Sequence, residues 1–305
     1  MIRGIQIRRV RHRWSAAFLL VIAILTLHAR PSCAQEPPYF VTYSHALEEP
    51  GNLEVAQKGT TAAPKDANAF YSSTLEFEYG MTAFWTTEFY LQGQATADDS
   101  TLFTGFRWEN RVRPLQREHV VNPVLYVEYE NVNLADKSVL EVTGNDGLST
   151  FQTRNAIGRA QVAHTLENRL ILSSNLRGWN FAENFIAEKN LSGDPWEFGY
   201  SLGTSRPIAL AAQARACIFC RQNFAAGAEL FGGLGTRQSF GLHQTSHYAG
   251  PTLELNIPRG PSLSFSPDFG LNSNSVGTLW RINTSYEVQQ FRDLFRHQSY
   301  HQEAQ

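Results

Sequence analysis

Four consecutive segments with a two-residue period, between Phe70 and Asn133, constrain this chain more than any other feature. The first alternates Tyr71, Leu75, Phe77 and Tyr79 with Ser72, Thr74, Glu76 and Glu78. The third sets Leu102, Thr104, Phe106 and Trp108 against Arg107, Glu109 and Arg111, and the second and fourth repeat the pattern from Trp85 and from Leu125. A period of two gives a β-strand one apolar face and one polar face. The pattern therefore predicts an all-β protein.

The length and composition of these segments favour a membrane barrel. Each is about ten residues long, which suits a strand that crosses a bilayer at a tilt. The apolar faces are rich in Trp, Tyr and Phe near the segment ends, as in the aromatic girdles of outer-membrane barrels. The polar faces carry charges of both signs, which suits a closed, wet interior. We predict a single antiparallel transmembrane β-barrel; a large soluble sandwich or barrel with one solvated face is the alternative.

Residues 1–34 have the composition of a secretory signal peptide. Five arginines precede an apolar run from Ala16 to Leu27, and Ser32 and Ala34 occupy the small-residue positions that a signal peptidase reads. The apolar run is short for a membrane span, so export is favoured over a helical anchor. We predict cleavage before Gln35.

The charge balance of the predicted mature chain argues against nucleic acid as a partner. The whole chain has 26 basic and 28 acidic residues, and residues 1–34 contain six of the arginines and none of the acids. Their removal leaves a formal charge of about −8, whereas phosphate neutralisation needs clustered Lys and Arg.

The mature chain is divided into three parts by the strand pattern. Residues 35–68 form either a leader that folds into the lumen or a first strand, residues 69–291 form the barrel, and residues 292–305 form a C-terminal tail. Beyond the first four, further strands are predicted at 137–143, 169–177, 179–189, 195–205, 223–235, 248–257, 263–271 and 276–288. The total is about twelve, with ten or fourteen as alternatives, and bacterial single-chain barrels have even numbers in this range.

The segment from Val276 to Val288 resembles the closing strand of Gram-negative outer-membrane barrels. The segments 101–113 and 184–207 are similar to a porin-like family of such proteins. The resemblance covers most of the mature chain, implies a fold and a location in the cell outer membrane, and supplies no chemistry. Such barrels usually end on an aromatic residue, a place that Phe291 fits, yet fourteen residues follow it. Either the tail is a periplasmic extension or the last strand lies differently.

The inward face of the predicted barrel carries the candidate functional residues. The lumen-facing charged candidates are Glu76, Glu78, Glu88, Arg107, Glu109, Arg111, Glu128, Glu130, Arg281 and Glu287. A charged wall of this kind sets the field and the selectivity of a pore. The alternative is purely structural, because opposite charges on neighbouring strands also form ladder pairs that fill an interior.

Catalysis and metal binding have weaker support. Ser246 and His247 are adjacent, but adjacent strand residues point to opposite faces, and no acidic partner is marked. An outer-membrane hydrolase that uses these residues is kept as an alternative. The His243–His247 and His297–His301 pairs lack a third ligand, so neither a metal nor a cofactor is expected.

Cys217 and Cys220 are predicted to form a local disulfide that staples a loop. Their Cys-x-x-Cys spacing lies in an exported chain, without the βαβ pattern of a thioredoxin-like pair and without a His after Cys220.

The sequence as a whole predicts a passive or weakly selective channel for small polar solutes, and not an enzyme. A non-transporting structural barrel remains a further alternative. The expected partners are outer-membrane lipid, the barrel-assembly machinery and the solutes themselves. The sequence assigns no oligomeric state.

Overall fold

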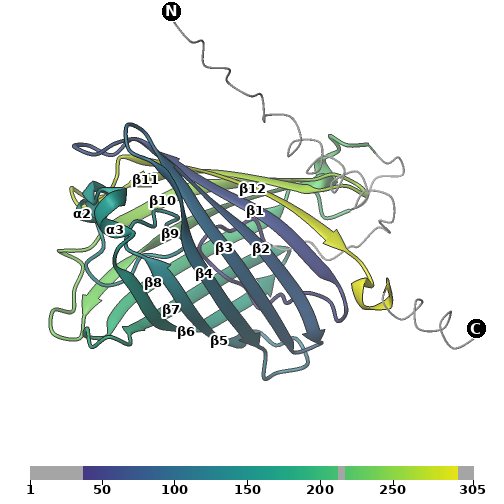
Figure 1. The fold of residues 1–305 in the computed structure, drawn as a ribbon. Helices are drawn as coiled ribbons and strands as arrows, with labels where there is room; N and C mark the ends of the chain where they lie inside the picture. The colour runs from purple at the N-terminus through teal and green to yellow at the C-terminus, as the bar shows by residue number, and fades with distance from the viewer. Residues whose placement is uncertain (1–36, 212–216, 295–305) are drawn as a thin grey trace, which may run out of the picture.

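Twelve strands close into one antiparallel barrel (Figure 1). The computed structural model describes residues 37–211 and 217–294. The strands are β1 (Leu53–Ala62), β2 (Phe70–Thr82), β3 (Trp85–Thr96), β4 (Thr101–Val112), β5 (Asn122–Asn133), β6 (Val162–Leu176), β7 (Trp179–Asn190), β8 (Glu197–Pro207), β9 (Phe224–Thr236), β10 (His247–Asn256), β11 (Ser262–Gly270) and β12 (Thr278–Val288). Each strand pairs with its sequence neighbours, and β1 pairs with β12, so the sheet has no open edge. The predicted fold class and the strand number are confirmed.

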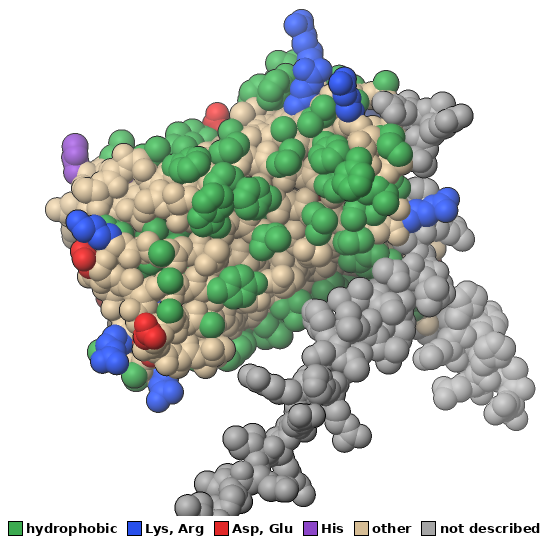
Figure 2. Space-filling view, turned by 90° about the horizontal axis from the view of Figure 1, so that it is seen from above, with side chains coloured by type: hydrophobic (Ala, Val, Ile, Leu, Met, Phe, Trp, Pro, Cys, Tyr) green, Lys and Arg blue, Asp and Glu red, His purple; other side chains and the backbone are tan. Residues whose placement is uncertain are grey.

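The two-residue period places the polar side chains inside and the apolar ones outside. In β2, Ser72, Thr74 and Glu76 are buried, whereas Tyr71 on the other face is exposed. Exposed Phe, Leu and Trp side chains cover the outer surface of many strands, and Figure 2 shows them spread over one side of the barrel. A polar interior with an apolar outer band is the arrangement of a barrel surrounded by lipid.

The alternation of the third predicted segment changes phase at a bulge. Gln92 of β3 pairs with Gly105, but the next residue of β3 pairs with Phe103, so Thr104 is an extra residue in β4. A bulge of this kind shifts the side chains beyond it to the opposite face. Thr104 is therefore buried inside and Phe103 is 62% exposed outside, which corrects the outward placement expected for Thr104.

The two ends of the barrel differ. At one end, called here the terminal end and drawn at the right of Figure 1, β1 begins and β12 finishes. At the opposite, helical end, the long connection between β5 and β6 carries α2 (Leu148–Gln152) and α3 (Asn155–Gly158). Both helices are about one turn long. Within the described ranges, no helix is long and apolar enough to cross a membrane.

The predicted hairpin about Gly178 is confirmed at the terminal end. Leu176 pairs with Trp179, and the two residues between them, Arg177 and Gly178, both have positive φ. Two positive φ values give the two-residue turn whose twist matches that of paired strands.

The strand predicted at residues 137–143 is wrong. β5 and β6 pair with each other over twelve positions, from Asn122 with Ser173 to Asn133 with Val162, which leaves no place for a strand between them. Residues 134–147, the inner loop, instead fold back into the barrel, where Lys137, Val142 and Thr143 are buried. A short alternating segment suits a polar interior as well as a barrel wall, so its period could not separate the two.

Residues 37–52, the leader, also lie inside the barrel, and the chain enters the wall at Leu53. Phe40, Val41 and Tyr43 of the leader contribute to the interior packing, in two clusters that also contain Phe231 of β9 and Tyr126 of β5. The predicted signal peptide and the residues from 295 onward lie outside the described residues and stay predictions.

Two glycines of β8 make room for the leader and the inner loop. A Cβ on Gly199 would collide with the backbone oxygen of Val142, and one on Gly203 would collide with the ring of Tyr39. Both glycines face inward, so an absent side chain lets a second layer of chain pass close to the wall.

The chain leaves the wall after Val288, and Phe291 follows three residues later. The ring of Phe291 packs edge-on against Tyr79 of β2, with 6.4 Å between the ring centroids. The aromatic residue expected at the end of the barrel thus contacts the wall beside β1.

Candidate functional site

A row of nine glutamates crosses nine neighbouring strands on the inner face of the wall. Each is directly opposite the next in the ladder: Glu287, Glu54, Glu78, Glu88, Glu109, Glu128, Glu167, Glu188 and Glu197. Barrel strands tilt against the axis, so a row perpendicular to the strands climbs along the lumen as it goes round. Glu54 is the second residue of β1, at the terminal end, and Glu197 is the first of β8, at the helical end. The glutamate row therefore follows the lumen from one end to the other.

Arginines in the neighbouring ladder rows compensate part of this charge. Arg107 lies 3.1 Å from Glu128 and 3.4 Å from Glu130. Arg111 lies 2.6 Å from Glu78 and 3.0 Å from Glu109, and it also contacts Glu88. Like charges directly opposite each other destabilise a sheet, so these flanking guanidiniums keep the row compatible with folding.

The lumen candidates named from the sequence all lie on the inner faces of their strands. Nine are buried, namely Glu76, Glu78, Glu88, Arg107, Glu109, Arg111, Glu128, Glu130 and Arg281, and Glu287 is half-buried. Two further ion pairs complete the wall, with Lys58 2.5 Å from Glu76 and Arg281 2.6 Å from Asp268.

Sequence reasoning missed several residues of the row and its surroundings, above all Glu54, Glu167, Arg169, Glu188 and Glu229. A signal existed for two of them. Glu167 and Arg169 stand on the polar side of a two-residue alternation in β6, but that strand was expected to begin only at Arg169. Register across strands is a property of the closed barrel, so the alignment of nine glutamates had no signal in the sequence.

Glu229 of β9 anchors the leader. Its carboxylate accepts backbone N–H hydrogen bonds from Phe40 at 2.8 Å, Val41 at 3.0 Å and Thr42 at 2.8 Å. Hydrogen bonds to an ionised acceptor are about twice as strong as neutral ones. One buried carboxylate thus satisfies three consecutive amides of a segment that has no strand partner.

A second anchor comes from Asn184 of β7. Its side-chain oxygen accepts from the Tyr43 N–H at 2.7 Å, and its side-chain nitrogen donates to the Tyr43 carbonyl at 2.8 Å. The amide thereby satisfies both backbone groups of Tyr43, as a paired strand would do.

The Tyr43 side chain reaches the glutamate row at the centre of the lumen. Its hydroxyl donates to Glu109 at 3.1 Å, and the guanidiniums of Arg111 and Arg169 both lie over its ring, 4.9 Å and 5.1 Å from the centroid. Burial, with the charges of Glu109 and Glu88, raises the pKa of Tyr43 well above its ordinary value. The phenol stays protonated and donates.

The inner loop is held by Glu141. Its carboxylate bridges Arg107 at 2.7 Å and Arg169 at 3.0 Å. Burial acts to raise the pKa of Glu141, but the two guanidiniums outweigh it and lower the pKa below the ordinary value. Arg169 also donates to the Val41 carbonyl at 3.1 Å, so one side chain joins the wall, the leader and the inner loop.

A cavity of about 770 Å³ remains at the terminal end. It lies between the leader and the inner faces of β1, β2 and β12, and its charged lining includes Glu54, Lys58, Glu78 and Glu287. The leader residues Tyr39 and Tyr43 line it as well. The part of the glutamate row at the terminal end is therefore open to a space large enough for small polar molecules.

Ser246 and His247 do not form a nucleophile and base pair. The Ser246 hydroxyl donates to the carbonyl of Asp146 at 2.9 Å. The two ring nitrogens of His247 face the Tyr200 hydroxyl at 3.1 Å and the Thr245 hydroxyl at 2.8 Å. A catalytic serine needs its base within hydrogen-bond reach, and here the two side chains have separate partners.

Carboxylates make up the groups that come within metal-ligand distance of one another in the described residues. They are Glu76–Glu78–Glu88, Glu128–Glu141–Glu167 and Glu130–Glu167–Glu188. Within residues 37–211 and 217–294, no such group includes His243 or His247, and His297 and His301 lie outside the described residues.

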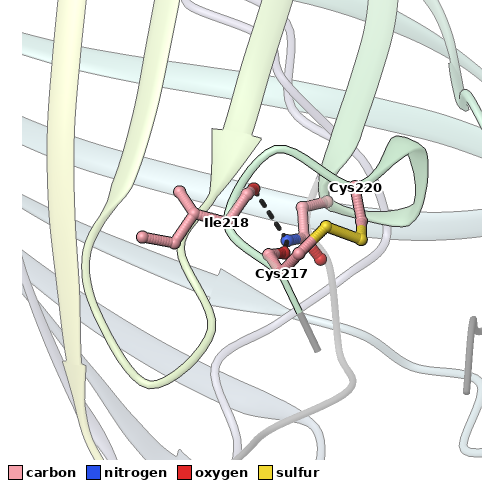
Figure 3. The surroundings of a disulfide bond; sticks show 4 residues. Cys217, Ile218 and Cys220 are labelled. Atoms are coloured by element: carbon pink, nitrogen blue, oxygen red, sulfur yellow. Dashed lines mark hydrogen bonds between the residues drawn. A yellow bond between two sulfur atoms is a disulfide. The ribbon is translucent and has the colours of Figure 1, made fainter. Parts of the chain in front are cut away.

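Cys217 and Cys220 are joined by a disulfide in the connection between β8 and β9, at the terminal end (Figure 3). The Asn223 side-chain amide donates to the carbonyls of Cys217 at 2.6 Å and Ile218 at 2.9 Å, which closes the same short loop. The disulfide therefore staples a loop between two strands and does not join strands of the wall.

Together, these features define a class of protein. A closed antiparallel barrel with an apolar outer surface and a charged interior is the fold of porin-like outer-membrane proteins.

No family model and no curated protein matches the chain. Among solved structures, an outer membrane channel of group COG4313 from Pseudomonas putida F1 is 11% identical, with a TM-score of 0.49, covering 83% of this chain and 99% of that one. The KdgM porin is 9% identical with a TM-score of 0.44, covering 76% and 98%. LpxR from Salmonella typhimurium is 9% identical with a TM-score of 0.41, covering 77% and 99%.

Proposed function

We propose that the chain is an outer-membrane channel for small polar solutes and that its lumen favours cations over anions. The glutamate row carries this proposal, because it extends fixed carboxylates along the lumen between the two ends. Rings and rows of carboxylates give cation preference in pores, since they lower the energy of a cation at each step along the path.

The charge around the row supports a cation preference. Three arginines flank the nine carboxylates of the row. Arg111 contacts three of them, whereas Arg107 and Arg169 contact one each and are also paired with glutamates outside the row. A lumen lined mainly by one sign of charge concentrates ions of the opposite sign. A small cation or a cationic polar solute is therefore the best match to this interior.

The leader and the inner loop limit the passage. Both occupy the lumen beside the row, and their hydrogen bonds and ion pairs to the wall centre on Glu229, Asn184 and Arg169. We propose that conduction depends on how far these two segments move away from the wall, which makes the described conformation a closed or poorly conducting one.

The proposal places the barrel in the outer membrane, with lipid around its apolar surface and with insertion by the barrel-assembly machinery. The first check is heat-modifiability in a washed outer-membrane fraction, since a closed barrel stays compact in SDS until it is boiled. A protein found soluble in the periplasm, with no band shift, would contradict the membrane location.

Reversal potentials test the function itself. The refolded protein is inserted into a planar bilayer under a KCl gradient, and we expect a reversal potential of the sign given by K⁺ permeation. The control is Glu183→Gln, which changes a carboxylate on the outer face of β7 and should leave the potential unchanged. A folded barrel that conducts no ions would indicate a structural role. A reversal potential of the opposite sign would show anion selectivity and would contradict the proposed cation preference.

A further inference from the structure

Five carboxylates converge inside the barrel near its helical end. Glu128, Glu130, Glu141, Glu167 and Glu188, called here the five-glutamate cluster, come from β5, β6, β7 and the inner loop. They form two overlapping groups that share Glu167, and in each group one oxygen from every member lies within 4.8 Å of the others. Carboxylates packed this closely repel one another strongly unless positive charge lies between them.

The arginines within reach do not complete the compensation. Arg107 contacts Glu128, Glu141 and one oxygen of Glu130, and Arg169 contacts Glu141 and one oxygen of Glu167. Five carboxylates therefore share two guanidiniums. The other bases on the inner faces of the strands have their ion pairs elsewhere: Lys58 with Glu76, Arg111 with Glu78, and Arg281 with Asp268. From that position the charge of Arg281 also helps to lower the pKa of Glu141, without an ion pair to the cluster.

Two buried oxygens in this cluster have no hydrogen-bond partner. They are Oε1 of Glu130 and Oε2 of Glu167, whose residues are 6% and 0% exposed. Glu188 has one oxygen held by the Thr143 hydroxyl at 2.6 Å. A buried carboxylate oxygen without a partner costs free energy, and that cost falls when a cation binds between such oxygens.

We propose that Glu130, Glu167 and Glu188 bind a divalent cation, with Ca²⁺ the best fit. Ca²⁺ takes six to eight oxygen ligands in flexible geometry and accepts carboxylates in either one- or two-oxygen contact. Three carboxylates from three neighbouring strands each supply one oxygen to this group, and water molecules can complete the coordination, as they do in other Ca²⁺ sites. Mg²⁺ fits less well because it requires near-octahedral geometry and retains several waters.

The site would fasten the inner loop to the wall. Glu188 is hydrogen-bonded to Thr143 of the inner loop, and Glu167 is paired with Arg169, which holds Glu141 of that loop. A cation between Glu167 and Glu188 thus orders β6, β7 and the loop together. This inference does not depend on the channel proposal, because a sealed barrel would bind the ion in the same way.

The test is a direct measurement of Ca²⁺ binding to the folded full-length mature protein. The protein is refolded in detergent without lipid, so that lipopolysaccharide does not compete for the ion. After chelation and buffer exchange, we expect saturable binding of about one Ca²⁺ per chain by calorimetry, and Tb³⁺ luminescence that Ca²⁺ reverses. Folding is checked by the band shift on boiling. No saturable binding to the folded wild-type chain would overturn the proposal without any variant.

Matched variants locate the site. Glu188→Gln keeps the shape and the acceptor for Thr143 but removes a charge, and we expect it to weaken Ca²⁺ binding about tenfold or more, because ligand charge count tunes such affinities. Glu183→Gln makes the same change on the outer face of the same strand and should bind like wild type. Equal affinity in wild type and Glu188→Gln would overturn the assignment. A second outcome would also overturn the assignment. If chelation leaves the unfolding midpoint of the wild-type protein unchanged at neutral pH, protons alone neutralise the five-glutamate cluster.

Discussion

Glu128 of β5 and Glu167 of β6 lie directly opposite each other in the barrel wall, and both are buried. Such a pair repels, so its presence requires compensation from the ladder rows on either side. Arg107 supplies it to Glu128 at 3.1 Å, and Arg169 supplies it to Glu167. The acidic wall therefore depends on a few arginines that also hold the leader and the inner loop.

Arg169→Gln should destabilise the barrel and free both inner segments. The change leaves Glu167 and Glu141 short of a counter-charge and removes the bond to the Val41 carbonyl. Removing one partner of a buried ion pair typically costs about 3–5 kcal/mol. The measurement is urea unfolding in detergent, followed by tryptophan fluorescence. Arg177→Gln, in the turn at the terminal end, is the control, and equal unfolding midpoints for the two variants would contradict the assignment of Arg169.

Glu229→Ala should release the leader and increase conductance. The variant removes an acceptor that holds three backbone amides, each bond contributing about 1.5–3 kcal/mol with a charged acceptor. We expect a faster liposome swelling rate with small neutral sugars and a larger single-channel current. A swelling rate equal to that of wild type, in a variant that still shows the band shift, would mean that the leader does not limit passage.

Conductance should rise as the pH falls below about 6.5, the ordinary pKa of histidine. Burial lowers the pKa of His45, although Glu118 acts in the opposite direction. The docked leader therefore favours the neutral ring, which lies 2.8 Å from the Ser173 hydroxyl. Because the pKa of His45 is depressed in the docked leader, the ring binds a proton more readily once the leader is released. A pH below about 6.5 therefore favours the released leader, whereas the docked leader keeps its full stability well above this pH.

His45→Gln isolates that contribution from the titration of the wall carboxylates. The variant keeps a polar side chain opposite Ser173 but has no charge to gain. Bilayer currents recorded from pH 7.5 to 5.5 should increase less in His45→Gln than in wild type. Identical pH profiles would exclude His45 as the group responsible.

His247→Ala should lower stability without removing any hydrolytic activity. The ring fills a space between Tyr200 and Thr245 and contacts both hydroxyls, so its loss removes two hydrogen bonds, each contributing about 0.5–1.5 kcal/mol. The assays are thermal unfolding and hydrolysis of ester and phospholipid substrates. Activity in wild type that is absent from a folded His247→Ala variant would revive the hydrolase alternative.

Replacing both Cys217 and Cys220 by Ser should leave the barrel intact. The disulfide closes a loop of only four residues outside the wall, so its effect in the chain-entropy model is about 2 kcal/mol and local. The band shift on boiling should be the same with and without reductant. A lost band shift in the double variant would show that the loop contributes to barrel folding.

The outer and inner faces of the strands could be read from the sequence because a single physical rule, the two-residue period, acts within each strand. That rule predicted the closed all-β fold, the strand number and the charged inner face of segments such as β2 and β12. It failed at Thr104, where a bulge adds one residue, and at residues 137–143, where an alternating segment lies inside the barrel instead of in its wall.

What only the tertiary structure decided is which residues meet. The glutamate row and the five-glutamate cluster depend on register between strands far apart in the chain, such as Glu54 of β1 with Glu287 of β12. Likewise, nothing local marks Glu229 as the acceptor for residues 40–42, because 187 or more positions separate the partners. A local period determines the face on which a side chain stands, and barrel closure determines what stands beside it.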